Sequence, residues 1–381
     1  MKLKRISAIA IFLILLVPMF LVSVFSAINL NINISSSLNY VVDLPNFEIF
    51  SQRASWGTTY QFVEVGMYPQ EYVGDDLNET LKLWYQTNNP VSVDEYTVYM
   101  SKVGEGTETY CEFNILYAYE YIDGNIYVRM PETNSAKYFV GSLGQGQNRI
   151  LDEELQHIDG TIDYMSGDEL IDEVEAWFKV QPIKWRILTQ NYNGQNISYL
   201  MSELLLSSSC FYFDYDADSA SYYENSNNYL KKYLEYFYQD AFTDYEKSLI
   251  VGRNFSLSDL DTTSSSSEIV LSDQKVWSPT YNDLNNTSYG FPEDTSYPGN
   301  LEDFGKNYSL HKSASDFTMA NNTRVYKCVR FPTIDREEGY DSSYYTISRS
   351  GNNVYIADMG FVSVGSYNSI MGVCPAILFN L

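Results

Sequence analysis

Pro182–Leu188 (PIKWRIL) shows its secondary structure more plainly than any other stretch of this chain. Ile183, Trp185 and Ile187 occupy every second position, and the positions between them include Arg186. Successive side chains of a β-strand point to opposite faces, so this period of two predicts a strand. We expect the tryptophan face to pack on a core and Arg186 to point the other way.

The flanking sequence predicts further strands joined by tight turns. Alternation in Tyr60–Val65 indicates a strand that stops at Gly66 and Pro69, because proline restricts the residue before it. Gly124-Asn125 and Asn193-Gly194 are typical hairpin turns. A sheet of antiparallel neighbours is therefore the expected surrounding of PIKWRIL.

A few helices interrupt the strands. Thr243 and Glu246 have the spacing of a capping box, which predicts a short helix that begins at Thr243. Apolar residues at helical spacing predict further helices, over Asp75–Trp84, Arg149–His157, Gly167–Phe178 and Asn227–Tyr238.

The sequence also predicts long irregular loops. Residues 290–322 are rich in Pro, Gly, Asp and Asn, which disfavour regular elements. We therefore expect an α+β fold, with mixed or antiparallel sheets, a few helices and long loops.

The N-terminus predicts export. Residues 1–27 join a basic start to an apolar run, which is typical of a cleaved signal peptide or of an uncleaved membrane anchor. Residues 28–47 are Asn- and Ser-rich and indicate a spacer, and 48–381 form the expected extracellular domain, with a sub-boundary near residue 180 as the alternative. We expect the protein to be secreted or held at the outer face of the cell membrane, with the membrane contacted only through residues 1–27.

The net charge of the chain limits the kinds of ligand that it can bind. The formal charge of −25 repels nucleic acid and anionic lipid surfaces. The 35 tyrosines are expected mainly in strands and at the surface. A ligand-binding face lined by tyrosines is the alternative interpretation. We expect no nucleic-acid partner, a monomer, and a glycan or a surface protein as ligand.

Five short motifs follow one another along residues 62–381. They are Gly66 with Tyr68-Pro69-Gln70, Pro182–Leu188, Tyr233–Ile250, Ser315–Ala320 and Gly372–Ile377. Together they resemble the bacterial family known as domain of unknown function 6273. The resemblance implies a bacterial, exported protein with no assigned activity. It extends, at the level of fold analogy alone, to C-type-lectin-like and formylglycine-generating-enzyme-like domains.

The chain departs from this family near its end. Cys374 stands where the family has an arginine, so an acidic partner of that arginine would lose its ion pair. The four cysteines allow two disulfides in three pairings, with four free thiols as the alternative. Because Cys374 is a departure from the family, Cys328 and Cys374 are our candidate disulfide.

The sequence offers no clear catalytic or metal motif. His157 and His311 stand outside zinc motifs, and GxSxG is absent. Asp214–Asp218 has the alternating acids of a calcium loop, but Ser219 and Asn225 replace the glycine and glutamate that such a loop needs. We therefore assign no catalytic residue, metal or cofactor. An extracellular hydrolase with two carboxylates remains the alternative, since 49 acidic residues offer many pairs.

Two loop regions, 206–228 and 285–325, are expected to form the ligand surface of a non-enzymatic binding or structural module. Aromatic side chains in them suit stacking on a sugar or packing on a protein. The candidate binding residues are Phe211, Tyr212, Tyr222, Phe291 and Tyr297.

Overall fold

The chain divides into two compact units, Met1–Phe47 and Glu48–Leu381, in a computed structural model. In the first unit, β1 (Ile32–Ile34) pairs antiparallel with β2 (Leu38–Tyr40). The predicted export segment lies outside the described residues, and among the described ones no helix is both long and apolar enough to cross a bilayer. The structure describes residues 32–34, 38–40, 47–54, 57–103, 109–131, 163–164, 175–211, 222–296, 308–321, 326–328, 339–341, 343–358, 360–365, 367 and 371–381.

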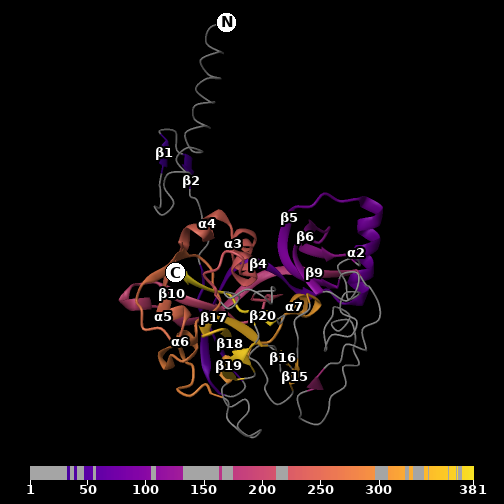
Figure 1. Cartoon of the computed structure of the whole chain (residues 1–381). Coiled ribbons are helices and arrows are strands. Elements are labelled where there is room, and N and C mark those ends of the chain that lie inside the picture. Colours follow the sequence, from indigo (N-terminus) through magenta and orange to yellow (C-terminus); the bar gives the residue numbers. More distant parts are fainter. Residues whose placement is uncertain are drawn as a thin grey trace. The chain divides into compact units, whose positions relative to one another are not determined.

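The long strand β9 (Ala176–Thr189) pairs with three other strands of the second unit (Figure 1). It contains PIKWRIL, and its whole length is an antiparallel strand, as the alternation predicts for residues 182–188. β4 (Thr59–Tyr72) pairs with one edge of β9. The other edge pairs with β7 (Ile126–Met130) in its first half and with β10 (Ser198–Ser202) in its second half. The nine-stranded sheet therefore branches at β9.

The remaining strands extend these branches or form smaller sheets. β3 (Phe50–Arg53) pairs with β4, while β6 (Thr109–Glu120) and β5 (Asp94–Val103) follow β7. β21 (Ala376–Phe379) and β12 (Ile250–Val251) follow β10. A five-stranded sheet joins β11 (Ser207–Ser209), β20 (Met371–Val373), β17 (Tyr344–Ser350), β18 (Asn353–Asp358) and β19 (Phe361–Gly365). Two small sheets join β13 (Arg253–Ser256) with β14 (Ile269–Gln274), and β16 (Gly339–Asp341) with β15 (Tyr326–Cys328) and β8 (Asp163–Tyr164).

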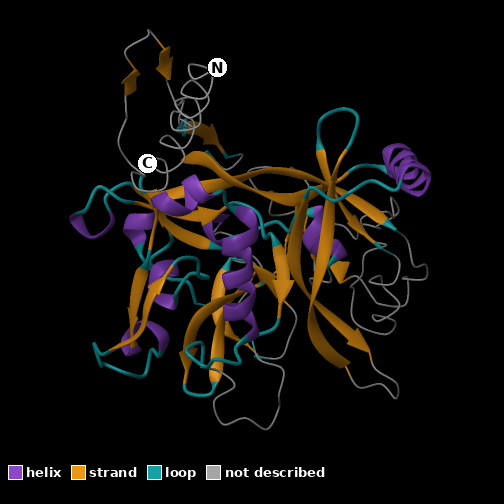
Figure 2. Cartoon of the chain, turned by 90° about the horizontal axis from the view of Figure 1, so that it is seen from above, coloured by secondary structure: helices purple, strands orange, loops and turns teal. Residues whose placement is uncertain are grey.

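Helices are few and mostly short, as Figure 2 shows. The longest, α2 (Asp75–Asn88), packs Leu81 against Trp177 of β9 and matches the predicted Asp75–Trp84 helix. The others are α3 (Tyr229–Ala241), α4 (Asp244–Leu249), α5 (Leu257–Leu260), α6 (Tyr281–Leu284), α7 (Asp316–Ala320), and the 3₁₀ turns η5 (Tyr192–Gly194), η6 (Thr287–Tyr289) and η7 (Tyr308–Leu310).

The α+β prediction is confirmed: the sheets are mostly antiparallel and the helices few. Both predicted hairpins form, β6 to β7 through Gly124-Asn125 and β9 to β10 through Asn193-Gly194. The predicted Gly167–Phe178 helix is wrong at its end, where residues 176–178 belong to β9. The alternative boundary near residue 180 falls inside β9, and Glu48–Leu381 is one unit, so the chain has no division there.

β4 does not stop at Gly66, contrary to the sequence prediction. The strand continues through Pro69 because the pairing with β9 shifts register between Glu64 and Met67. Gly66 takes a φ of 72° at this bulge, a conformation that favours glycine. Its freed N–H donates to Glu246 Oε1 at 2.8 Å. A side chain 180 residues away therefore completes the bulge.

The same glutamate caps α4. Thr243 accepts from the Glu246 N–H, and Glu246 accepts from the Thr243 N–H, so the predicted capping box forms. α3 buries Leu230, Tyr233, Leu234 and Phe237 on the stripe that its sequence predicts. The Tyr233 hydroxyl lies 2.9 Å from that of Tyr68 on β4. The family-like motifs on β4, β9 and the α3–α4 pair thus meet in one core, where the ring of Trp185 also stacks on Phe242.

Replacement of Gly66 tests the packing of the β4 bulge against the end of α3. A Cβ there would lie 2.7 Å from the Ala241 carbonyl oxygen and 2.8 Å from the Phe242 ring. We expect Gly66→Ala to lower the free energy of unfolding by about 3 kcal/mol, since backbone and ring must both move. Gly290→Ala is the matched control, because Gly290 also has a positive φ but nothing lies within 4 Å. Urea denaturation should show that Gly290→Ala lowers the free energy of unfolding by about 1 kcal/mol. Equal losses in the two variants would contradict the close contact of Gly66 with Ala241 and Phe242.

Asp240 of α3 covers the edge strand β5. Its Oδ2 accepts from the Thr97 N–H at 2.7 Å. Burial raises the pKa of Asp240 to about 6, and Asp94 and Glu95 add to this, while the hydrogen bonds from Thr97 oppose it. The charged form is therefore disfavoured in the folded protein relative to the unfolded chain.

This shift predicts a pH dependence of stability. Because the folded pKa lies above the unfolded value, the unfolding free energy from this group should rise as the pH falls from 7 through 6 toward 4. Asp240→Asn keeps an acceptor for Thr97 and should stabilise the fold at pH 7 by on the order of 1 kcal/mol, after allowance for solvent screening. Denaturation curves at several pH values measure this. Glu235→Gln, on an exposed position of the same helix, should change neither quantity.

Candidate functional site

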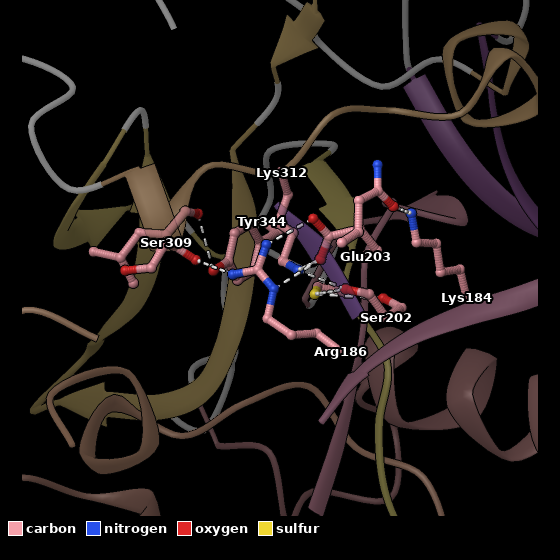
Figure 3. A network of polar contacts seen from close by, with 10 residues as sticks. Lys184, Arg186, Ser202, Glu203, Ser309, Lys312 and Tyr344 are labelled. Carbon is pink, nitrogen blue, oxygen red and sulfur yellow. Dashed lines mark hydrogen bonds and ion pairs between the residues drawn. The ribbon is translucent and has the colours of Figure 1, made fainter. Parts of the chain in front are cut away.

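The most conspicuous polar cluster of the second unit is buried and closed (Figure 3). Arg186 of β9 binds the carboxylate of Glu203 through two hydrogen bonds, from Nε at 2.9 Å and from Nη2 at 2.6 Å. Its Nη1 donates to the Ser309 carbonyl at 3.0 Å. Lys312 donates to Glu203 Oε2 at 3.1 Å and to the Ser202 carbonyl at 2.7 Å. Arg186 points away from the Trp185 face, as the alternation predicts, and this second face is buried as well.

Burial and charge act on each member of this cluster. Burial raises the pKa of Glu203, but Arg186 and Lys312 more than offset it, and its pKa lies below the usual value. Burial lowers the pKa of Lys312, and the neighbouring Arg186 lowers it further. All three side chains are at most 3% exposed. The cluster is thus sealed from solvent, and its chemistry is that of a structural ion network.

Cys374 lies beside this network and is a free, buried thiol. The candidate disulfide with Cys328 is therefore not formed in the structure, and the Cys328 side chain lies outside the described residues. Ser202 Oγ lies 3.5 Å from Cys374 Sγ, and burial raises the pKa of the thiol. The expected orphan acid is absent from this cluster, because Glu203 has two cationic partners.

The predicted aromatic ligand face is mostly core where the structure describes it. Phe211 is fully buried between Tyr223 and Tyr345, and Phe291 is 4% exposed. Tyr222 is partly exposed, and its ring stacks on Arg349. Tyr212 and Tyr297 lie outside the described residues. Phe211 and Phe291 are therefore not presented to a ligand.

An open hollow lies on the surface over β4 and β9. It has a volume of about 490 Å³. The amides of Gln70, Asn125 and Gln181 contribute to its lining, and Gln70 Nε2 donates to the carbonyls of Gln181 and Pro182 at 3.1 and 3.0 Å. The full lining comprises Glu64, Met67, Gln70, Asn125, Lys179, Val180, Gln181, Pro182, Lys184 and Leu204.

Cross-strand register balances the charges of this hollow. Lys184 stands opposite Glu64, and Lys179 stands opposite Glu71, which accepts a hydrogen bond from Gln181 at 2.8 Å. Opposite charges at facing positions of neighbouring strands compensate each other. The hollow therefore offers uncharged donors and acceptors in a nearly neutral setting.

Sequence reasoning did not find this hollow. Gln70 belongs to a motif that indicates the fold, and Gln181 immediately precedes PIKWRIL. The one available signal was the presence of amide side chains within long strands, where β-branched and aromatic residues are commoner. The concave shape depends on the β4 bulge and on the register with β9, which the sequence does not reveal.

Comparisons with protein-family models, curated proteins and solved structures found no match to this chain. The resemblance to domain of unknown function 6273 and the lectin-like fold analogy therefore stay predictions. Within the described residues, no group of three or more His, Cys, Asp or Glu side chains could hold a metal ion.

Removal of Glu203 tests the structural role of the buried network. Glu203→Ala leaves Arg186 and Lys312 buried without their carboxylate, so we expect a loss of about 3–5 kcal/mol in unfolding free energy. The double variant Glu203→Ala with Lys312→Met should recover part of this loss, because it removes one unpaired charge. Urea denaturation of both variants is the measurement. A loss near zero for Glu203→Ala would contradict the role.

Proposed function

We propose that this protein is an exported, non-enzymatic binding module of the bacterial surface, which binds a neutral glycan in the hollow over β4 and β9. The observation that supports it is the amide-lined hollow with balanced charges. Hydroxyl groups of a sugar both donate and accept hydrogen bonds, as the amides of Asn125 and Gln181 do. Gln70 Nε2 already donates to two backbone carbonyls, so this side chain contributes an acceptor. Met67, which is 40% exposed, and Pro182 add apolar surface for the C–H faces of a sugar ring.

The balance of charges favours a neutral ligand. An anionic ligand would meet Lys179 and Lys184 only with their acidic neighbours beside them, on a chain whose formal charge is −25. That field repels anions over long distances. A glycan without acidic groups avoids this repulsion and matches the amide lining.

The same lining disfavours a hydrolase that uses two carboxylates. Such an enzyme places two acids about 5–9.5 Å apart across the bond that it cleaves. Glu64 is the one carboxylate among the residues that line the hollow. Binding without cleavage is therefore the better account of this hollow.

Substitution of the amides tests the proposal. Residues 28–381 would be titrated with a panel of neutral oligosaccharides by isothermal calorimetry, before and after the double change Asn125→Ala and Gln181→Ala. Each ligand hydrogen bond contributes about 0.5–1.5 kcal/mol, so we expect affinity to fall about tenfold. Affinity should vary little with salt concentration, since the ligand carries no charge.

Gln190→Ala supplies the matched control. Gln190 is an exposed amide that follows β9 but does not line the hollow, so its loss should leave affinity unchanged. Equal affinity in the double variant and the parent would contradict a site in the hollow. Absence of binding to every neutral glycan would contradict the function itself.

A further inference from the structure

Arg349 lies where three distant segments of the chain meet. It belongs to β17, and the Thr262 N–H, just after α5, donates to its carbonyl at 3.0 Å. Its guanidinium carbon lies 3.6 Å from the ring centroid of Tyr222 in the turn before α3. Its Nη2 lies 3.1 Å from Asp261 Oδ2 and 3.7 Å from Glu224 Oε1. Backbone and stacking contacts thus fix the arginine in place.

The hydrogen bonding of this arginine is incomplete. Arg349 is 5% exposed, yet its Nε and Nη1 have no hydrogen-bond partner, and neither has the buried Oε2 of Glu224. An unsatisfied buried polar group destabilises the folded state, and a charged one does so more strongly. Native proteins therefore leave such groups unpaired rarely, and usually where water or a ligand completes them.

Arg186 shows what a purely structural buried arginine looks like in this chain. Its Nε, Nη1 and Nη2 all donate to protein oxygens. Arg349 is also buried and has two carboxylate neighbours, Asp261 and Glu224, but its Nε and Nη1 have no hydrogen-bond partner. Contacts within the protein therefore satisfy Arg186 fully and Arg349 only in part.

The local charge selects the kind of group that would complete Arg349. Two carboxylates, Asp261 and Glu224, face one guanidinium. Burial raises the pKa of Asp261, but hydrogen bonds from Thr263 and the charge of Arg349 more than offset it, so the pKa lies below the usual value and the group stays ionised. The site carries a net negative charge, which disfavours a carboxylate or phosphate ligand. A hydroxyl group accepts from Arg349 and donates to Glu224 without adding charge.

We propose that Arg349 and Glu224 form a second binding site, distinct from the hollow, which takes a hydroxyl group of a neutral sugar. The ligand hydroxyl accepts from Nε of Arg349 and donates to Glu224 Oε2. The unused atoms are themselves covered, so a side chain has to move when the ligand enters. Glu224 is the group that moves, because its side chain is 23% exposed while that of Arg349 is 6% exposed.

Nuclear magnetic resonance of the arginine Nε–Hε groups tests this site directly. The Arg349 resonance is assigned by its loss in Arg349→Lys, or by the ring-current change in Tyr222→Ala if the lysine variant does not fold. The protein would be titrated with neutral hexoses and N-acetylhexosamines. We expect this resonance to shift on titration, and the midpoint concentration to rise about tenfold in Glu224→Ala.

Two matched variants make the result specific. Glu235→Ala removes an exposed acid from the neighbouring helix and should leave the midpoint unchanged. Asn125→Ala with Gln181→Ala disables the proposed hollow site and should leave the Arg349 shift unchanged, so the two proposals fail separately. The second site is overturned if no sugar moves the Arg349 resonance. It is also overturned if Glu224→Ala binds as the parent does.

Discussion

The second unit depends on the pairing of β9 along both of its edges. This strand has β4 along one edge, and β7 and β10 along the two ends of the other. Around Trp185 and Arg186 both faces of the strand are also covered, since Trp185 is fully buried and Arg186 is 2% exposed. A charged residue on an enclosed strand needs a counter-ion. Glu203 supplies it for Arg186, and Lys312 binds the same carboxylate.

Long-range partners also decide where the elements end. β4 continues past a glycine and a proline because Glu246 accepts the N–H that its bulge leaves free. The same carboxylate caps α4, so one side chain ties the course of a strand to the start of a helix. Glu246 thereby links α4 to the bulge of β4, and the hollow lies over β4 and β9.

Features set by residues close in the sequence were therefore predictable, and contacts between residues far apart in the sequence were not. The alternation of PIKWRIL, the stripe of α3 and the capping box at Thr243 depend on residues within a few positions, and the structure has all three. The burial of Arg186 depends on Glu203 and Lys312, and the aromatic residue Phe211 became core because Tyr345 packs on it. The hollow requires a register between strands more than 100 residues apart, which no short pattern contains.

Both proposed sites favour an uncharged ligand, although the chain itself carries a formal charge of −25. A neutral ligand gains nothing from electrostatic steering, so its association is slower than that of a charged ligand drawn by an opposite field. A shallow site with a few hydrogen bonds also binds weakly. Two weak sites on one chain compensate for this when the ligand is a repeating polymer, because binding at one raises the effective concentration at the other. A surface glycan is such a polymer, and its many identical units make weak, uncharged recognition sufficient.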